Sequence, residues 1–368
     1  MKAALMAKQF DVKGRLVTAE ATGSGNVNDT FLVVFRTTFS EERFIMQKIN
    51  TRVFPNPALI MENMKKVTEH VHKRLEEEAA TADRIWQLPR VIPTKTGADF
   101  AVDGDGGFWR AISLIASAHS YESIQSPEHA SEAGYVLGQF QRLISDIPPE
   151  TLHDTLPGFH ITPGYLAKMD QALATPEGRA RLESSSEARR CHRFIEDRRA
   201  WCTVLEDAKA RGDLKIRPIH GDPKIANIMI DDATGKGTCI VDLDTVKPGL
   251  VHYDIGDCLR SCCNPAGEET NDLSNVFFDT DLCRTIVKGY MGFAKSFLSE
   301  ADRHYLYDAI RLIAFELGLR FFADYVAGDQ YFKVRYEGQN LNRARVQLKL
   351  CESIEAREPA IRKILESA

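Results

Sequence analysis

The chain has 368 residues, of which 43% are hydrophobic and 27% are charged. This composition is typical of a globular protein that is long enough for two lobes, each with its own core. The formal net charge of −5 argues against a nucleic-acid partner, because proteins that bind phosphate backbones are usually basic. No apolar run approaches the length of a membrane span, and residues 1–15 lack the long apolar core of an export signal. These features predict a protein of the cytoplasm that has no membrane partner.

The eight cysteines show no pattern of a disulfide framework or a metal site. No CxxC pair occurs, and Cys262 and Cys263 are adjacent, which suits neither a shared metal nor an easy disulfide. The sequence therefore predicts free thiols in a reducing compartment.

The first third of the chain predicts a small β-rich lobe. Its strand-like runs, dense in β-branched and aromatic residues, are residues 17–21, 30–36, 43–49, 98–102 and 108–115. A helix is predicted from about Ala58 to Glu78, because apolar residues there recur at helical spacing after Pro55 and Pro57. The DGDGG run between the last two strands predicts a hairpin turn.

A short polar segment, residues 116–120, follows the last of these strands and predicts a hinge. It would separate an N-terminal lobe of residues 1–115 from a C-terminal lobe of residues 121–368. The second lobe is mostly helical by pattern, with helices predicted at residues 127–144, 163–173, 177–209, 299–328 and 340–365. Short strands are predicted at residues 216–220, 228–231 and 239–243. The predicted fold class is thus α+β with two unequal lobes.

The most informative motif is HGDPKIANIMI at residues 220–230, followed by IVDLD at residues 240–244. Asp222 lies five residues before Asn227, which opens a short apolar run, and Asp242 ends a second apolar run. Phosphoryl transfer from a nucleotide needs this order of groups: a carboxylate that accepts the proton of the attacking hydroxyl, then an amide and a carboxylate that hold metal ions. The motif predicts Asp222 as the catalytic base and Asn227 and Asp242 as ligands of Mg²⁺.

Four neighbouring residues have supporting roles in this interpretation. His220 braces the loop by hydrogen bonding, and Asp254 in the YDIGD run holds the loop through backbone N–H groups. Lys224 either neutralises charge on the transferred phosphoryl group or is an exposed surface lysine. Asp244 is either a ligand of a second metal ion or a solvated acid in a turn.

A glycine-containing segment between the first two strands is a candidate phosphate-binding loop. Its residues are Gly23, Ser24, Gly25 and Asn26. Glycines let the backbone approach phosphates, and small polar side chains add donors. Only the first two glycines of a kinase-type GxGxxG are present, so an Asn- and Gly-rich hairpin turn is an equally good local interpretation.

The cation that pairs with the nucleotide phosphates is expected on the third strand, which reads FIMQKI. Gln47 occupies the place of the lysine in the VAIK pattern of kinases, and Lys48 follows it. Adjacent strand residues point to opposite faces, so only one of them faces the nucleotide. Charge favours Lys48 and pattern favours Gln47. Glu62, near the start of the next helix, is either the ion-pair partner of this cation or a solvated acid.

Taken together, the motifs show that the chain resembles the aminoglycoside phosphotransferase/choline kinase superfamily, and within it the N-acetylhexosamine 1-kinases and related sugar phosphotransferases. The segments that carry the resemblance are GSGNVNDTF, MQKINTRVFPNP, MENMKKVTEH, HGDPKIANIMID, VDLDTVKPGLVHYDIGD, LGLRFFADYVAGDQYF and NLNRARVQLKL. The resemblance implies a protein-kinase-like fold with ATP bound between the lobes, Mg²⁺ as the required ion, and a sugar phosphorylated at its anomeric hydroxyl. It also implies that Arg320 and Tyr331 contact this sugar.

Other interpretations remain open. Arg320 has acids one helical turn away, at Glu316 and Asp324, with which it could pair, and Tyr331 could be a packing residue. The acceptor could also be another small alcohol: an aminoglycoside, choline or ethanolamine, or methylthioribose. A catalytically silent nucleotide-binding protein with a kinase-like fold is a third possibility, which the presence of all three motif residues disfavours.

Overall fold

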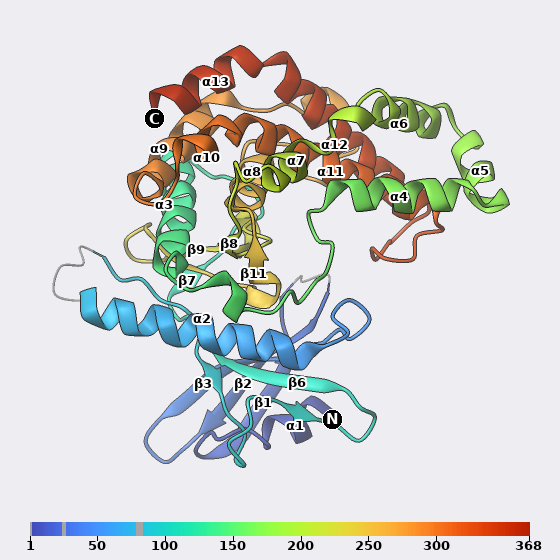
Figure 1. The fold of residues 1–368 in the computed structure, drawn as a ribbon. Coiled ribbons are helices and arrows are strands. Elements are labelled where there is room, and N and C mark those ends of the chain that lie inside the picture. Colours follow the sequence, from blue (N-terminus) through green and yellow to red (C-terminus); the bar gives the residue numbers. More distant parts are fainter. Residues whose placement is uncertain (1, 24–26, 79–83) are drawn as a thin grey trace.

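The N-terminal part of the computed structural model, which describes residues 2–23, 27–78 and 84–368, is an antiparallel sheet with one long helix (Figure 1). The strand order is β1-β2-β3-β6-β4, and β5 pairs with β6. The strands are β1 (Arg15–Ala21), β2 (Asp29–Arg36), β3 (Glu41–Ile49), β4 (Val91–Ile92), β5 (Ala101–Val102) and β6 (Phe108–Ser113). Helix α1 (Lys2–Ala7), which the sequence did not predict, and the predicted α2 (Pro57–Glu78) complete this lobe.

The two faces of the sheet pack against different cores, because successive side chains of a strand point to opposite faces. Phe44 and Met46 of β3 lie on the outer face, in a small core shared with α1. Ile49 of β3 and Phe108 of β6 lie on the inner face, in the core shared with α2 and the C-terminal lobe. In Figure 1, α2 runs between the sheet and the C-terminal lobe. Any strand side chain that takes part in a site between the lobes must therefore be on the inner face.

The C-terminal lobe is mainly helical, as the sequence predicts. Its helices are α3 (Pro127–Ile144), α4 (Thr162–Leu173), α5 (Pro176–Glu183), α6 (Ser186–Glu196), α7 (Val204–Ala210), α8 (Val251–Cys262), α9 (Thr280–Ala294), α10 (Glu300–His304), α11 (Leu306–Val326), α12 (Gln339–Ala356) and α13 (Glu358–Ser367). Two small sheets complete it, one of order β10-β9-β7 and one that pairs β11 with β8. Their strands are β7 (Ala118–His119), β8 (Arg217–Ile219), β9 (Ile228–Asp231), β10 (Gly237–Ile240) and β11 (Lys247–Gly249).

Three of the predicted helices are broken in the structure. The predicted helix at residues 299–328 divides at Tyr305, which ends α10 and begins α11. The predicted helix at residues 340–365 divides at Arg357, and Pro359 lies in the first turn of the second piece, where proline is tolerated. The predicted run at residues 177–209 forms three helices, because Ser185 caps α6 and a 3₁₀ turn precedes α7.

All eight cysteines are free and buried, as predicted. No helix in the described parts of the chain is long and apolar enough to cross a membrane.

Candidate active site

The catalytic loop predicted from the HGDPKIAN motif connects β8 to β9, and a side chain of α8 holds its backbone. Asp254, fully buried on α8, accepts hydrogen bonds from the backbone N–H groups of His220 at 2.9 Å and Gly221 at 2.8 Å. Gln141 of α3 donates to the same carboxylate at 3.0 Å. Gly221 has a φ of +89°, and a Cβ there would lie 2.6 Å from the carbonyl oxygen of Thr245. The loop therefore requires glycine at this position.

His220 lies within this loop and is fully buried. Its Nε2 is 3.0 Å from the carbonyl oxygen of Val241, and its Nδ1 accepts the backbone N–H of Asp222 at 3.2 Å. Burial lowers the pKa of His220 to about 4, so the imidazole is neutral. This neutral ring ties the Asp222 loop to the segment that carries Asp242.

Asp222 is half-buried and is held by two side chains of its own loop. Nδ2 of Asn227 donates to the Asp222 carbonyl oxygen at 2.7 Å and to Oδ2 at 3.3 Å. Nζ of Lys224 lies 2.8 Å from Oδ2. Burial acts to raise the pKa of Asp222, but the Lys224 ammonium outweighs it, so the pKa lies below its usual value. Lys224 is thus not a free surface lysine, and it keeps Asp222 ionised.

Asp242 follows β10 in the left-handed region, with a φ of 66°, and its side chain is accessible to solvent. Although part of the residue is exposed, the surrounding protein desolvates the carboxylate, and this effect together with the negative charges of Asp244 and Asp222 raises its pKa to about 6. Lys224 and Arg110 oppose this shift. Asp222 and Asp242, far apart in sequence, are therefore close enough to interact electrostatically, and the crowded negative charge favours a cation.

Asp244 is buried, and its environment excludes the interpretation as a solvated turn acid. Asn28 Nδ2 donates to its Oδ2 at 2.6 Å. Its Oδ1 forms an ion pair with Arg110 Nη2 at 2.5 Å. Asp244 therefore joins both the β2 end and β6 of the N-terminal lobe to the C-terminal lobe.

The choice between Gln47 and Lys48 is decided by the pleat of β3. Gln47 accepts hydrogen bonds at its Oε1 from Arg110 Nε at 2.9 Å and Nη2 at 2.6 Å, on the inner face of the sheet. Lys48 points to the outer face, where its Cε lies 2.9 Å from the position of a Cβ on Gly107. The residue that faces the C-terminal lobe is therefore Gln47, which the VAIK pattern favours, and not Lys48, which the expected charge favours.

The interpretation of Glu62 as the ion-pair partner of a cation on β3 is wrong. Glu62 Oε2 instead lies 2.8 Å from His153 Nε2, and both side chains are substantially exposed. The neighbouring residues Ile60, Met61, Asn63 and Met64 are buried, and Glu62 lies on the outward side of α2. In the candidate phosphate-binding loop, Gly23 has a φ of +79°, and a Cβ on it would meet no described atom within 4 Å. Ser24, Gly25 and Asn26 lie outside the described residues.

Arg320 and Tyr331 line one pocket of about 200 Å³ in the C-terminal lobe, next to α4 and α11. The other lining residues are Leu156, Pro157, Phe159, Tyr165, Lys168, Ala323, Asp324, Ala327 and Phe332. The Arg320 guanidinium lies 5.0 Å from the ring centre of Phe159 and 5.1 Å from that of Tyr165. The Arg320 guanidinium therefore packs among aromatic rings, with the Glu316 carboxylate one turn away close enough to interact with its charge. The pocket combines a cation with apolar walls.

The pocket and the catalytic loop are joined by His160, which the sequence did not single out. Its Nε2 lies 2.8 Å from the carbonyl oxygen of Gly221, and its Nδ1 lies 3.0 Å from Glu316 Oε1. Glu316 also accepts a hydrogen bond from Thr162 Oγ1 at 2.8 Å. Burial acts to lower the pKa of His160, but the Glu316 carboxylate outweighs it and raises the pKa. The Asp222 loop is thus joined through His160 to Glu316, which lies one turn of α11 from Arg320.

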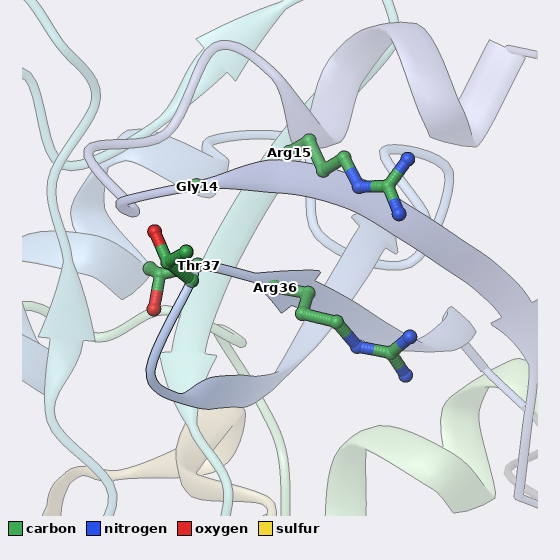
Figure 2. Close-up of a pocket in the computed structure, with 5 residues that line it drawn as sticks. Gly14, Arg15, Arg36 and Thr37 are labelled. Atoms are coloured by element: carbon green, nitrogen blue, oxygen red, sulfur yellow. The ribbon is translucent and has the colours of Figure 1, made fainter.

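A second, open pocket lies at the edge of the N-terminal sheet, away from these residues. It is lined by Gly14, Arg15, Arg36, Thr37 and Thr38. Figure 2 shows the side chains of Arg15 and Arg36 extending side by side from neighbouring strands. Arg36 is already paired with Glu41 at 2.9 Å. None of the motif residues lines this pocket, so it is not part of the candidate active site.

The donor set at the lobe boundary fits a magnesium ion that is shared with phosphates. Because Asn227 uses its Nδ2 as a donor to Asp222, its Oδ1 is the atom suited to a cation. In the described part of the chain, no group of three His, Cys, Asp or Glu side chains is arranged to hold a metal by itself. Mg²⁺ in phosphoryl-transfer sites is usually held by one or two protein oxygens plus substrate phosphates. Asn227 and Asp242 match this requirement.

Comparisons with known proteins agree with this geometry. The sequence matches the phosphotransferase enzyme family over residues 18–275. The structure is similar to an aminoglycoside phosphotransferase from Alicyclobacillus acidocaldarius, with a TM-score of 0.58, 13% identity, and coverage of 99% of this chain and 96% of the other. It is also similar to a choline kinase from Cryptosporidium parvum (TM-score 0.57, 10% identity, 95% and 93% coverage) and to a microcompartment-associated aminopropanol kinase (TM-score 0.56, 14% identity, 98% and 98% coverage). At these identities the structural likeness shows the fold alone, and it confirms the expected protein-kinase-like architecture.

Proposed function

Because the chain belongs to the phosphotransferase enzyme family, we propose that it is an ATP- and Mg²⁺-dependent kinase whose acceptor is a sugar of the N-acetylhexosamine type. In this proposal the γ-phosphate is transferred to the anomeric hydroxyl. In this proposal residues 1–115 form the nucleotide-binding lobe and residues 121–368 the lobe that carries the catalytic loop and the acceptor pocket. Residues 116–120 form the hinge, of which Ala118 and His119 pair with β9 of the C-terminal lobe.

The observation that carries the sugar proposal is the charge of the pocket lined by Arg320 and Tyr331. Lys168 and Arg320 contribute positive charge to it. Its acid, Asp324, accepts hydrogen bonds from the backbone N–H groups of residues 330–332 and from Asn340 Nδ2. An acid committed in this way has little capacity left for a substrate ammonium group. The pocket therefore favours a neutral polyol over choline, ethanolamine or an aminoglycoside, all of which are cationic.

The size and the walls of the pocket support the same acceptor. Its volume of about 200 Å³ is small compared with the pockets of drug-sized ligands, so a single sugar ring suits it better than a multi-ring aminoglycoside. Phe159, Tyr165 and Phe332 supply aromatic surfaces for the apolar faces of a sugar ring, and the guanidinium of Arg320 supplies donors for its oxygens.

In the proposed mechanism, Asp222 orients the acceptor hydroxyl and takes its proton when the bond to phosphorus has begun to form. Lys224 keeps this carboxylate ionised before the transfer. Asn227 and Asp242 would hold Mg²⁺, which would neutralise charge on the phosphates. His160 fixes the position of Asp222 relative to the pocket through the Gly221 carbonyl. In-line transfer depends on this positioning.

The test is an assay of Mg²⁺-dependent ADP release with a panel of acceptors. We expect turnover with N-acetylated hexosamines, and a phosphate at the anomeric position of the product by ³¹P and ¹H NMR. Little turnover is expected with choline, ethanolamine or aminoglycosides. Preferred phosphorylation of any of these cationic alcohols would refute the sugar assignment while leaving the kinase assignment intact. If the folded protein neither hydrolyses ATP nor transfers phosphate to any of the acceptors, the silent nucleotide-binding alternative is favoured.

A further inference from the structure

We propose that Arg110 on β6 supplies the cation that binds the nucleotide phosphates, in place of the lysine that kinases carry on the third strand. The inference rests on the proposed nucleotide-dependent function and assigns a residue that no sequence motif marks. Four observations carry it: strand register, orientation, proximity to the site acids, and unused bonding capacity.

Strand register places Arg110 on the correct face. Gln47 and Arg110 are direct cross-strand partners in the antiparallel pair of β3 and β6, and residues directly opposite each other share one face of a sheet. Gln47 stands at the position where the kinase pattern has its lysine. The charge missing at Gln47 is therefore present on the same face, one strand away, at a spacing of about 4.8 Å.

Gln47 also orients the guanidinium. Its Oε1 accepts hydrogen bonds from both Nε and Nη2 of Arg110, at 2.9 Å and 2.6 Å. Its own Nε2 donates to Thr30 Oγ1 at 3.1 Å, which fixes the amide. Two donors held by one fixed acceptor leave a long side chain little rotamer freedom, so binding a ligand would cost little further ordering.

Arg110 reaches the acids of the proposed metal site. Its Nη2 lies 2.5 Å from Asp244 Oδ1, two residues along the chain from Asp242. The side chain is only 1% exposed. An arginine in this position faces the place where Asp242 and Asn227 would share Mg²⁺ with a phosphate chain.

Arg110 still has an unused donor. Among the described residues, Nη1 is buried and has no hydrogen-bond partner. An unsatisfied buried donor is costly and calls for an explanation, and a bound ion or ligand is one that fits a candidate active site. Phosphate oxygens are the natural acceptors, because the guanidinium binds them in a fork geometry that lysine lacks.

The alternative is that Arg110 only ties the two lobes together through Asp244. The two roles differ in what they recognise: a phosphate-binding residue discriminates ADP from adenosine, whereas a structural tie affects both equally. The experiment is titration calorimetry of the full chain with ADP and with adenosine, both in EDTA to remove the metal contribution. The proteins are the unmodified chain, Arg110→Gln, Arg110→Lys and the matched control Lys48→Met, which removes a cation from the other face of the neighbouring strand.

We expect Arg110→Gln to weaken ADP binding by about 10- to 100-fold and to leave adenosine binding unchanged. Arg110→Lys keeps the charge next to Asp244, and so the fold, but loses the fork. It should show a smaller loss that is again confined to ADP. Lys48→Met should bind both ligands as the unmodified chain does.

Equal losses for ADP and adenosine, or normal ADP affinity in both Arg110 variants, would overturn the proposal and leave Arg110 as a structural residue. A loss of ADP affinity in Lys48→Met as large as that in Arg110→Gln would also overturn it. If the unmodified chain binds neither ligand, the proposed nucleotide-dependent function fails together with this inference, which is a distinct outcome.

Discussion

At the scale of single residues, the candidate active site is a set of hydrogen bonds that fixes one carboxylate. Asp222 is positioned by Asn227 and Lys224 within its loop, while Asp254 and His160 hold the backbone of that loop from two sides. Each of these partners acts on geometry or charge, and Asp222 alone is placed to take a proton. The chemistry should therefore be separable from folding and from nucleotide binding.

Asp222→Asn tests this separation. The amide is nearly isosteric with the carboxylate, so folding and ADP affinity should be unchanged, whereas kcat should fall by roughly 10²- to 10⁴-fold because proton acceptance is lost. Steady-state kinetics with the best acceptor of the panel, together with ADP calorimetry, measures both effects. Turnover near that of the unmodified chain would remove Asp222 from the mechanism.

His220 makes the stability of the protein depend on pH. Its pKa is about 4 in the folded state because it is buried, and about 6.5 in an unfolded chain. Between these values only the unfolded chain binds the proton, so stability present above pH 6.5 is lost as the pH falls towards 4, at about 1.4 kcal/mol per pH unit from this residue. Urea unfolding at pH 6.5, 5.5 and 4.5 should show a shallower loss for His220→Asn than for the unmodified chain. If the stability of the two proteins falls with pH at the same slope, His220 takes up its proton in the folded protein as readily as in the unfolded chain.

The residues that a sequence can identify are those whose spacing the chemistry dictates. Asp222, Asn227 and Asp242 belong to one ordered motif, and the structure brings Asp222 into contact with Asn227 and within electrostatic range of Asp242. Arg110 and His160 escaped notice because their roles depend on cross-strand register and on a contact between distant segments. The sequence left Glu62 open between an ion-pair partner and a solvated acid, although helical spacing favours the second. Asn63, three residues after Ile60 and four before Val67, shares the buried face of α2, and Glu62 does not.

At the scale of elements, local patterns predicted the longer strands and the amphipathic helices well, missed the short strands β4, β7 and β11, and predicted long helices poorly. Helix α3 was predicted with its observed bounds, since Ser126 caps its start and Pro127 follows. The break at Arg357 had a local signal, since Pro359 within a helical pattern ends or kinks the helix before it. The break at Tyr305 has no glycine or proline beside it. Helix α1 is too short for a periodicity to be visible.

The pair α3 and α9 shows how a helix contact is set by glycines. A Cβ on Gly134 of α3 would lie 2.0 Å from the carbonyl oxygen of Ile286, and one on Gly289 of α9 would lie 2.4 Å from that of Ser131. Such distances allow no side chain, so the two backbones meet directly. This contact supports α3, whose Gln141 in turn holds Asp254 beneath the catalytic loop.

We therefore predict that Gly134→Ala destabilises the protein by about 3 kcal/mol, because the helices must move apart. Gly292→Ala, on the exposed side of α9, is the matched control, since a Cβ there meets nothing within 4 Å. It should stabilise the protein by about 0.5–1 kcal/mol through helix propensity. Chemical unfolding of both variants measures the difference, and a similar effect of the two substitutions would contradict the close contact.

At the scale of the whole molecule, the site exists only where the lobes meet, and its geometry depends on the bonds between them. Arg110 reaches Asp244 from the sheet, and Asn28 reaches the same carboxylate from the end of β2. On the other side, α2 bonds to the C-terminal lobe through Asn63, whose Nδ2 donates to the carbonyl oxygens of His153 at 2.8 Å and Val246 at 2.9 Å. Val246 lies two residues after Asp244, so α2 fixes the backbone of the segment that carries the acids.

The last prediction compares two neighbours on α2 that both bond to His153. Asn63 is buried and also accepts the His153 N–H at 2.9 Å, so Asn63→Ala leaves the buried carbonyl of Val246 and two partly buried backbone groups of His153 without this partner. It should cost roughly 3 kcal/mol of unfolding free energy. Glu62 pairs with the His153 side chain at an exposed site, and Glu62→Gln should cost less than about 0.5 kcal/mol. If the two substitutions cost the same in chemical unfolding, the lobes are not joined through Asn63, and the alignment of Arg110 with the site acids must depend on the Asp244 contacts alone.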